Sequence, residues 1–141
     1  LALNVFFTYQ KVPEQLVEWL SGQIDSRIAF LLIVNVFLLI VGCIMDIGSA
    51  ILILAPMLMP LAAAQGIDPV HFGMIVTLNI CIGMITPPFG LDIFVASSTL
   101  ERPVMSIIAG VWPFVLVNII ALLIVTYVPD ISLFVPSLIF R

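Results

Sequence analysis

Two adjacent prolines interrupt the apolar stretch Asn79-Ile80-Cys81-Ile82-Gly83-Met84-Ile85-Thr86-Pro87-Pro88-Phe89-Gly90-Leu91-Asp92. A proline has no backbone N–H, and its ring clashes with the carbonyl four residues earlier in a helix. Pro87 and Pro88 therefore remove the donors that would reach the carbonyls of Gly83 and Met84. The stretch predicts a helix that breaks over 86–90 and then resumes.

The composition places this break inside a membrane. Of the 141 residues, 63% are hydrophobic and 9% are charged, against about a quarter charged in soluble domains. Mean hydropathy is +1.35. A membrane-spanning helix needs roughly 18 to 25 apolar residues, whereas a barrel strand needs about ten in strict alternation. We therefore expect an all-α integral membrane protein, a polytopic helical bundle; the charge-free stretches that carry this are 28–45, 47–67, 69–91 and 103–129.

Charge and cysteine usage exclude other classes. Four Lys and Arg against eight Asp and Glu give a net charge of −4 and no basic patch, so nucleic acid is not an expected partner. Cys43 and Cys81 lie in apolar segments without a CxxC spacing, which favours packing over a disulfide or a transition-metal site. The chain opens without Met or a basic region, and we treat it as the C-terminal part of a longer protein.

The pattern of prolines, glycines and charges divides the chain into segments that we expect to follow one another in the membrane. They are 1–10, the end of a preceding transmembrane helix; 12–22, an interfacial amphipathic helix; 27–46, a transmembrane helix; 47–66, a re-entrant hairpin; 69–98, a discontinuous transmembrane helix broken at 86–90; 104–128, a transmembrane helix; and 129–141, an interfacial tail.

The hairpin rests on Pro56 and Pro60, which lie near the centre of 47–66. Two limbs of about nine residues would each be about 14 Å long, reaching only the middle of the membrane. A single kinked crossing is the alternative. The hairpin would put Arg27 and Arg102 on one side, with Lys11, and the positive-inside bias would make that side cytoplasmic. The kinked crossing would separate Arg27 from Arg102.

The break also carries the candidate chemistry. Backbone carbonyls and the Thr86 hydroxyl are hard oxygen ligands suited to Na⁺, and irregular backbone survives at membrane depth only where it is buried in protein or lines a cavity. Gly83 and Gly90 allow close backbone approach. The half-helix that begins near Gly90 offers N–H groups to a carboxylate. The alternative is a proline kink that only shapes packing.

Two carboxylates and three asparagines lie in the apolar segments. An intramembrane carboxylate is costly and marks an ion or substrate path, which makes Asp46 and Asp92 candidates, although Asp46 also fits a cap across Gly48-Ser49. Asn79, two turns before Thr86, is placed to face the site. Asn35 and Asn118 favour hydrogen bonds between helices. We expect the only histidine, His71, at a membrane boundary and not as a ligand.

Four blocks taken in order resemble the large membrane subunit, DctM type, of tripartite ATP-independent periplasmic (TRAP) transporters. This resemblance implies the second of two inverted repeats of an elevator-type secondary transporter in the bacterial inner membrane, driven by Na⁺ as coupling ion without other cofactors. Its cargo would be organic acids such as C4-dicarboxylates or sialic acid. Its partners would be a periplasmic solute-binding protein, a small four-helix DctQ-type subunit and the N-terminal repeat. The blocks are Gly42-Cys43-Ile44-Met45-Asp46, Ala50-Ile51-Leu52-Ile53-Leu54-Ala55-Pro56, Gly66-Ile67-Asp68-Pro69-Val70-His71-Phe72-Gly73 and Gly83-Met84-Ile85-Thr86-Pro87-Pro88-Phe89-Gly90-Leu91.

The resemblance also implies roles for individual residues. The segment 48–66 would be the outward-side hairpin of the transport domain, and Ser49 and Asp92 would lie close to substrate and ion. Many relatives carry asparagine where Asp92 stands, so this residue either titrates, alters ion coupling or replaces one oxygen ligand with another. The full candidate set comprises Gly83, Met84, Thr86, Pro87 and Pro88 for Na⁺, and Asp46, Ser49, Asn79, Gly90 and Asp92 for the substrate and ion path.

Two other functions stay open on the sequence. Asp46 and Asp92 could form the paired carboxylates of an intramembrane aspartyl protease. However, Asp92 follows Phe89-Gly90-Leu91 and not a GxGD pattern, and Met45 stands where a tyrosine would precede Asp46. A structural assembly subunit without its own transport site is the third possibility, and it leaves the broken helix unexplained.

Overall fold

A computed structural model describes residues 26–139, and this part of the chain is helical, with no strand. Three of its helices, α3, α4 and α7, are long and apolar enough to cross a membrane. The expected all-α, polytopic membrane fold is confirmed. The predictions for 1–10 and 12–22 lie outside the described residues. The helices are α3 (Arg27–Ile44), α4 (Ile47–Ala64), α5 (Pro69–Met84), α6 (Leu91–Thr99), α7 (Val104–Tyr127) and α8 (Pro129–Ile139).

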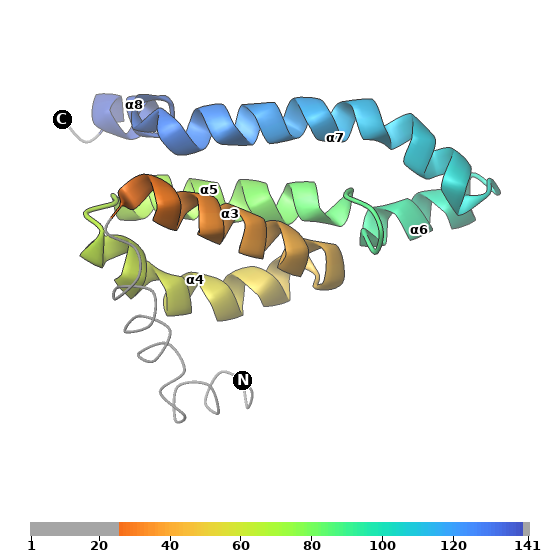
Figure 1. Ribbon diagram of the computed structural model, residues 1–141, viewed down its shortest axis with the longest axis horizontal. Coiled ribbons are helices and arrows are strands. Elements are labelled where there is room, and N and C mark those ends of the chain that lie inside the picture. Colours follow the sequence, from red (N-terminus) through yellow and green to blue (C-terminus); the bar gives the residue numbers. More distant parts are fainter. Residues whose placement is uncertain (1–25, 140–141) are drawn as a thin grey trace.

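Helices α3, α4 and α5 lie beside one another, each running in the direction opposite to the one before it, and short capped turns join them (Figure 1). The Asp46 side chain accepts a hydrogen bond from the Ser49 N–H and caps α4. Asp68 accepts from Val70 and His71 and caps α5. Gly66, with φ of 67°, follows α4 in the left-handed region that glycine adopts without strain. These caps satisfy helix-end N–H groups that lipid cannot satisfy.

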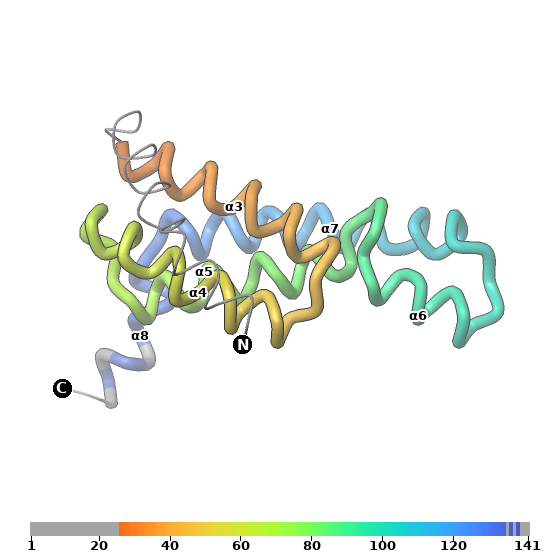
Figure 2. The backbone as a smooth tube through the Cα atoms, turned by 90° about the horizontal axis from the view of Figure 1, so that it is seen from below, coloured from red at the N-terminus to blue at the C-terminus, as the bar shows by residue number. Residues whose placement is uncertain are grey.

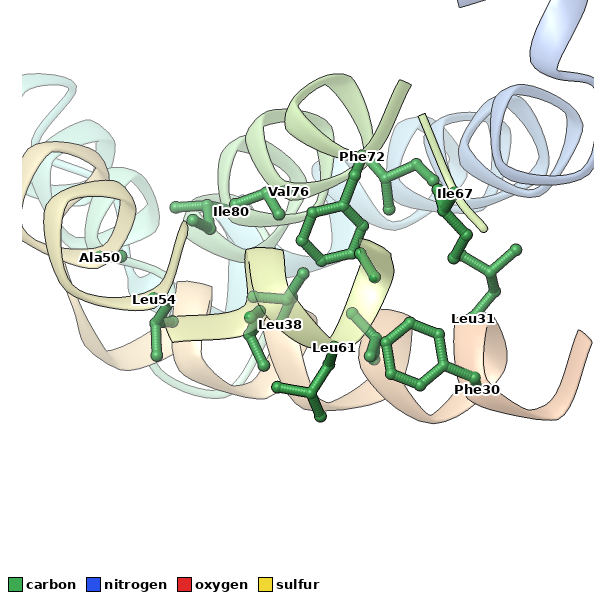
Figure 3. Close-up of a cluster of buried hydrophobic side chains, with 14 residues drawn as sticks. Phe30, Leu31, Leu38, Ala50, Leu54, Leu61, Ile67, Phe72, Val76 and Ile80 are labelled. Carbon is green, nitrogen blue, oxygen red and sulfur yellow. The ribbon is translucent and has the colours of Figure 1, made fainter. Parts of the chain in front are cut away.

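One cluster of buried apolar side chains joins the three helices (Figure 3). Between helices in lipid, burial of apolar area gives little driving force, because lipid tails are as apolar as leucine; close packing and hydrogen bonds hold the helices together instead. The cluster comprises Phe30, Leu31, Val34 and Leu38 from α3; Ala50, Leu54, Leu58, Leu61 and Ala62 from α4; Ile67; and Phe72, Ile75, Val76 and Ile80 from α5.

The tightest contact in this packing is where α3 crosses α5 at two glycines. A Cβ atom added to Gly83 would lie 2.6 Å from the Cα atom of Gly42, and one added to Gly42 would lie 2.9 Å from the Ile80 carbonyl oxygen. Both distances are too short for real Cβ atoms, so the two backbones touch directly. Small residues permit this approach, as in other membrane helix pairs.

Helices α5 and α6 together form one long arm that runs antiparallel to α7 (Figures 1 and 2). The 24 residues of α7 span about 36 Å, whereas the 18 residues each of α3 and α4 span about 27 Å. The turn between α3 and α4 lies beside the break between α5 and α6, and α6 extends beyond it (Figure 1). The pair α3–α4 therefore turns part of the way along α7.

The prediction of two short limbs over 47–66 is wrong, because α4 is one continuous helix of 18 residues with Pro56 and Pro60 inside it. Both prolines lie on the exposed face of α4, opposite the buried Ala50, Leu54 and Leu58. A missing hydrogen bond on the outer, convex face lets a helix bend around its neighbour without ending. The kinked-helix alternative describes this segment.

The continuity of α4 also determines at which end of the bundle Arg27 and Arg102 lie. Helix α3 begins at the end of the bundle where α4 meets α5, whereas the turn between α6 and α7 lies at the opposite end (Figure 1). Arg27 and Arg102 are therefore at opposite ends, and the expectation that they share one side is wrong. In the segment 129–141, which we expected as an interfacial tail, residues Pro129–Ile139 form the helix α8.

Gly42→Ala should lower the thermal stability of the full-length protein in lipid nanodiscs. The new methyl group meets the Ile80 carbonyl and the Gly83 Cα atom, and overpacking of this kind costs about 1–3 kcal/mol. Gly73→Ala on α5 is the matched control, because a Cβ there meets nothing within 4 Å, and it should be neutral or stabilising. Equal melting temperatures for the two variants would contradict the close crossing.

Candidate functional site

The break between α5 and α6 is a compact turn with its own hydrogen bonds. The Ile85 N–H donates to the Ile82 carbonyl at 3.2 Å, and the Thr86 N–H donates to the Gly83 carbonyl at 2.9 Å. The Thr86 hydroxyl donates to the Ile82 carbonyl at 2.6 Å. The expectation that Pro87 leaves the Gly83 carbonyl without a donor is therefore wrong, since a tighter bond from Thr86 replaces the helical one.

Met84 carries the carbonyl that the prolines leave unpaired. Its helical donor would be residue 88, which is Pro88, and none of the described residues donates to it. Gly90 covers this oxygen closely: a Cβ atom there would press on the Met84 carbonyl oxygen and lie 2.9 Å from that of Thr86. Glycine is the residue that fits. Thr86 and Met84 are half-buried, so both stay within reach of a small ligand.

The turn between α3 and α4 reaches the break through Cys43. Its thiol donates to the Thr86 carbonyl across 3.5 Å, and the Gly90 N–H donates to the same oxygen at 3.1 Å. With two donors, the Thr86 carbonyl has both lone pairs occupied. The oxygens at the break that keep unused lone pairs are thus the Met84 carbonyl, the Thr86 hydroxyl and the Gly83 carbonyl, which has one left.

Asp46 and Ser49 lie at the start of α4, next to this contact in sequence. Asp46 accepts from the Ser49 N–H at 2.9 Å, and its carbonyl accepts from the Ala50 N–H at 3.0 Å. Both Asp46 and Ser49 are exposed in this chain. The alternative in which Asp46 forms a cap across Gly48-Ser49 is confirmed, since Asp46 is the N-cap of α4.

Asp92 lies in the first turn of α6, whose N-cap is Gly90 without a side-chain cap. Its side chain is exposed, while the next residue, Ile93, is buried. A carboxylate in the first helical turn interacts favourably with the positive end of the helix dipole. The N-terminus of α6 thus faces the break with one negative charge already beside it.

Asn79 contacts Asn35 on α3, and its amide nitrogen donates to Asn35 Oδ1 at 2.7 Å. It is fully buried. Asn35 makes the expected interhelical bonds, whereas Asn118 donates to the Phe114 carbonyl of its own helix. His71, in the first turn of α5, is fully buried and bonded to Ser132 and Thr126.

Sequence reasoning missed two residues at the break, Gly42 and Cys43. Both precede the α3–α4 turn, and only the packing of α3 on α5 brings them to Gly83 and Thr86. Their signal in the sequence is a pair of small residues four and three positions before Asp46. Among the described residues no group of three His, Cys, Asp or Glu side chains is placed to hold a metal ion. The candidate ligands are therefore backbone and hydroxyl oxygens.

The described residues form a helical, polytopic fold with a helix broken next to an apolar segment and an unpaired carbonyl at the break, and membrane transporters contain broken helices of this kind. The sequence matches the family model described as "Tripartite ATP-independent periplasmic transporter, DctM component" over residues 1–131. This chain belongs to that family.

Curated relatives agree with the family assignment. The C4-dicarboxylate TRAP transporter large permease protein DctM of Rhodobacter capsulatus is 42% identical over 96% of this chain and 31% of its own length. Its namesake in Pseudomonas aeruginosa is 41% identical over 92% of this chain and 30% of its own length. The isethionate TRAP transporter permease protein DctMQ of Oleidesulfovibrio alaskensis is 41% identical over 90% of this chain and 20% of its own length. The chain thus spans less than a third of the length of these relatives. Its membership in a transporter family contradicts the protease alternative.

Asp46→Ala should destabilise the start of α4, because it removes the acceptor for the Ser49 N–H. Loss of an N-cap costs about 1 kcal/mol. Thermal unfolding of the full-length protein in nanodiscs should show a lower midpoint for Asp46→Ala than for Asp46→Asn, whose side-chain oxygen still caps. If both variants lose the same stability, the charge of Asp46 matters more than its cap.

Proposed function

We propose that this chain is part of the permease of a Na⁺-coupled secondary transporter that imports organic acids delivered by a periplasmic binding protein. The observation that carries the proposal is the Met84 carbonyl, which has no donor among the described residues at the break of α5 and α6. Relatives named as permeases for C4-dicarboxylate and isethionate support an organic anion as cargo. C4-dicarboxylates and sialic acid are the first substrates to test.

The ion site would be built from oxygens that already lie together. The Met84 carbonyl is unpaired, and the Thr86 hydroxyl keeps its lone pairs while it donates to Ile82. The Gly83 carbonyl has one lone pair left beside its bond from Thr86. Met84 is half-buried, and a bound cation would give its carbonyl the partner that it lacks.

The substrate carboxylate would lie at the N-terminus of α6, where Gly90 leaves the helix without a side-chain cap. Asp92 places a negative charge in the same turn. A second anion therefore meets repulsion there unless a cation neutralises it. This gives the coupling a simple electrostatic basis, since Na⁺ near the break would make room for the substrate charge.

The hairpin that would close over the site is the pair of helices α3 and α4, and not a hairpin within 47–66 alone. Its turn ends beside the break, and the Cys43 thiol contacts the Thr86 carbonyl there. Movement of the turn would open or cover the Met84 carbonyl and the α6 N-terminus. In an elevator-type transporter, the α3–α4 pair and the break would move together with the corresponding elements of the other inverted repeat.

The remaining partners follow from the family. They would be a periplasmic solute-binding protein, a small four-helix DctQ-type membrane subunit and the N-terminal repeat, in the inner membrane of a bacterium. The name DctMQ of one relative supports an association between the two membrane components. An assembly subunit without a transport site is the competing function, and it predicts no ion dependence at Thr86.

Thr86→Ala should raise the Na⁺ concentration needed for half-maximal uptake, because it removes one oxygen ligand from the break. The matched control is Thr77→Ala, whose hydroxyl makes the same back-bond to its own helix, at Gly73, away from the break. Uptake is measured in proteoliposomes that contain the full-length permease, its small subunit and the binding protein. Thr86→Ser should retain Na⁺ dependence.

An unchanged Na⁺ dependence in Thr86→Ala, with normal amounts of protein in the membrane, would contradict this ion site. A loss shared by Thr86→Ala and Thr77→Ala would assign the effect to helix bending and not to a ligand.

Asp92→Asn tests whether the charge in the first turn of α6 is needed. If Asp92 only supplies an oxygen ligand, uptake and Na⁺ dependence should stay within about twofold, since the asparagine amide keeps a side-chain oxygen at this position. The measurement is the initial uptake rate against Na⁺ concentration in the same proteoliposomes. A large loss of uptake with normal expression would show that the negative charge is required.

A further inference from the structure

A chain of buried polar side chains connects α8 and α7 to α5 and α3. Ser132 on α8 and Thr126 on α7 contact His71, and Thr126 contacts Asn35, which contacts Asn79. All five residues are more than nine-tenths buried. Such groups are costly in a membrane interior unless every donor and acceptor is paired, so their hydrogen bonds can be accounted for one by one.

The tautomer of His71 is set by its neighbours. Its Nε2 atom lies 3.2 Å from the Thr126 carbonyl oxygen, which can only accept, so Nε2 carries the proton. Its Nδ1 atom, 3.0 Å from the Ser132 hydroxyl, then accepts from that hydroxyl. Both ring nitrogens are satisfied, and this end of the chain is complete.

The orientation of the Asn79 amide is also determined. Its Nδ2 atom lies 2.8 Å from the Ile75 carbonyl oxygen and 2.7 Å from Asn35 Oδ1. A flipped amide would put an oxygen against the Ile75 carbonyl, so both hydrogens of Nδ2 are used here. The Asn79 Oδ1 atom then has no donor at all, although it is buried.

At the Asn35–Asn79 end of the chain, hydrogen-bond donors and acceptors are left without partners. Asn35 Nδ2 donates one hydrogen to the Thr126 hydroxyl at 3.2 Å. Its second hydrogen has no acceptor among the described residues, and the hydroxyl hydrogen of Thr126 has none either. One acceptor and two donor hydrogens are therefore unpaired within a single contact of α3, α5 and α7.

We propose that this contact binds one water molecule, which donates to Asn79 Oδ1 and accepts from the Asn35 amide or the Thr126 hydroxyl. Water is the ligand that fits, because it both donates and accepts, and a buried water makes about three such bonds. A cation is disfavoured, since it needs several oxygen ligands and only one acceptor here is unpaired. The water would complete a hydrogen-bonded chain from α8 to α3 and α5.

The test is a structure of the full-length permease in lipid nanodiscs, at a resolution that shows ordered water, in Na⁺ buffer and in choline buffer. We expect density at hydrogen-bond distance from Asn79 Oδ1, about 2.7–3.0 Å, in both buffers. Density that appears only with Na⁺, at clearly shorter distances, would identify a cation and overturn the proposal. Absence of density, with carbon atoms packed on Oδ1, would overturn it as well.

A pair of variants checks the same site. Asn79→Leu should abolish the density, whereas Asn118→Leu, which removes a half-buried amide bonded only to its own helix, should keep it. Persistence of the density in Asn79→Leu would show that other groups hold the molecule. Because the wild-type comparison needs no substitution, the proposal stays testable even if Asn79→Leu fails to fold.

Discussion

The structure depends on one constraint: a backbone carbonyl at membrane depth must find a donor, and two adjacent prolines remove two donors from one helix. The chain meets this constraint at one of the two carbonyls. Thr86 donates its N–H to the Gly83 carbonyl at the end of α5. The Met84 carbonyl stays unpaired among the described residues, and this oxygen supports the ion site that we propose at the break.

Small residues then allow the rest of the chain to reach the break. Gly42 and Gly83 bring the backbones of α3 and α5 into contact, and Gly90 fits against the carbonyls of Met84 and Thr86. Cys43, next to Gly42, contacts the Thr86 carbonyl. Backbone proximity and one weak hydrogen bond therefore join the α3–α4 turn to the break, beside the apolar cluster that packs α3 and α4 on α5.

The sequence was sufficient for the fold class, because apolar length and the scarcity of charge are local properties. It was also sufficient for the break at Pro87 and Pro88, since a tandem proline stops a helix wherever it lies. It was insufficient for Pro56 and Pro60. Whether a proline ends a helix or bends it depends on the face it occupies, and that face is set by the packing of α4 on α5. The same holds for Asn79, whose partner Asn35 is distant in sequence, and for His71, which only the fold brings to α7 and α8.

Coupling of an organic anion to Na⁺ at the break is tested by uptake of a labelled C4-dicarboxylate into proteoliposomes that hold the complete permease with its small subunit, supplied with the binding protein. Uptake is compared between an inward Na⁺ gradient and a collapsed gradient. We expect uptake above the external concentration only when both the gradient and the binding protein are present. Equal accumulation with choline in place of Na⁺ would contradict this coupling.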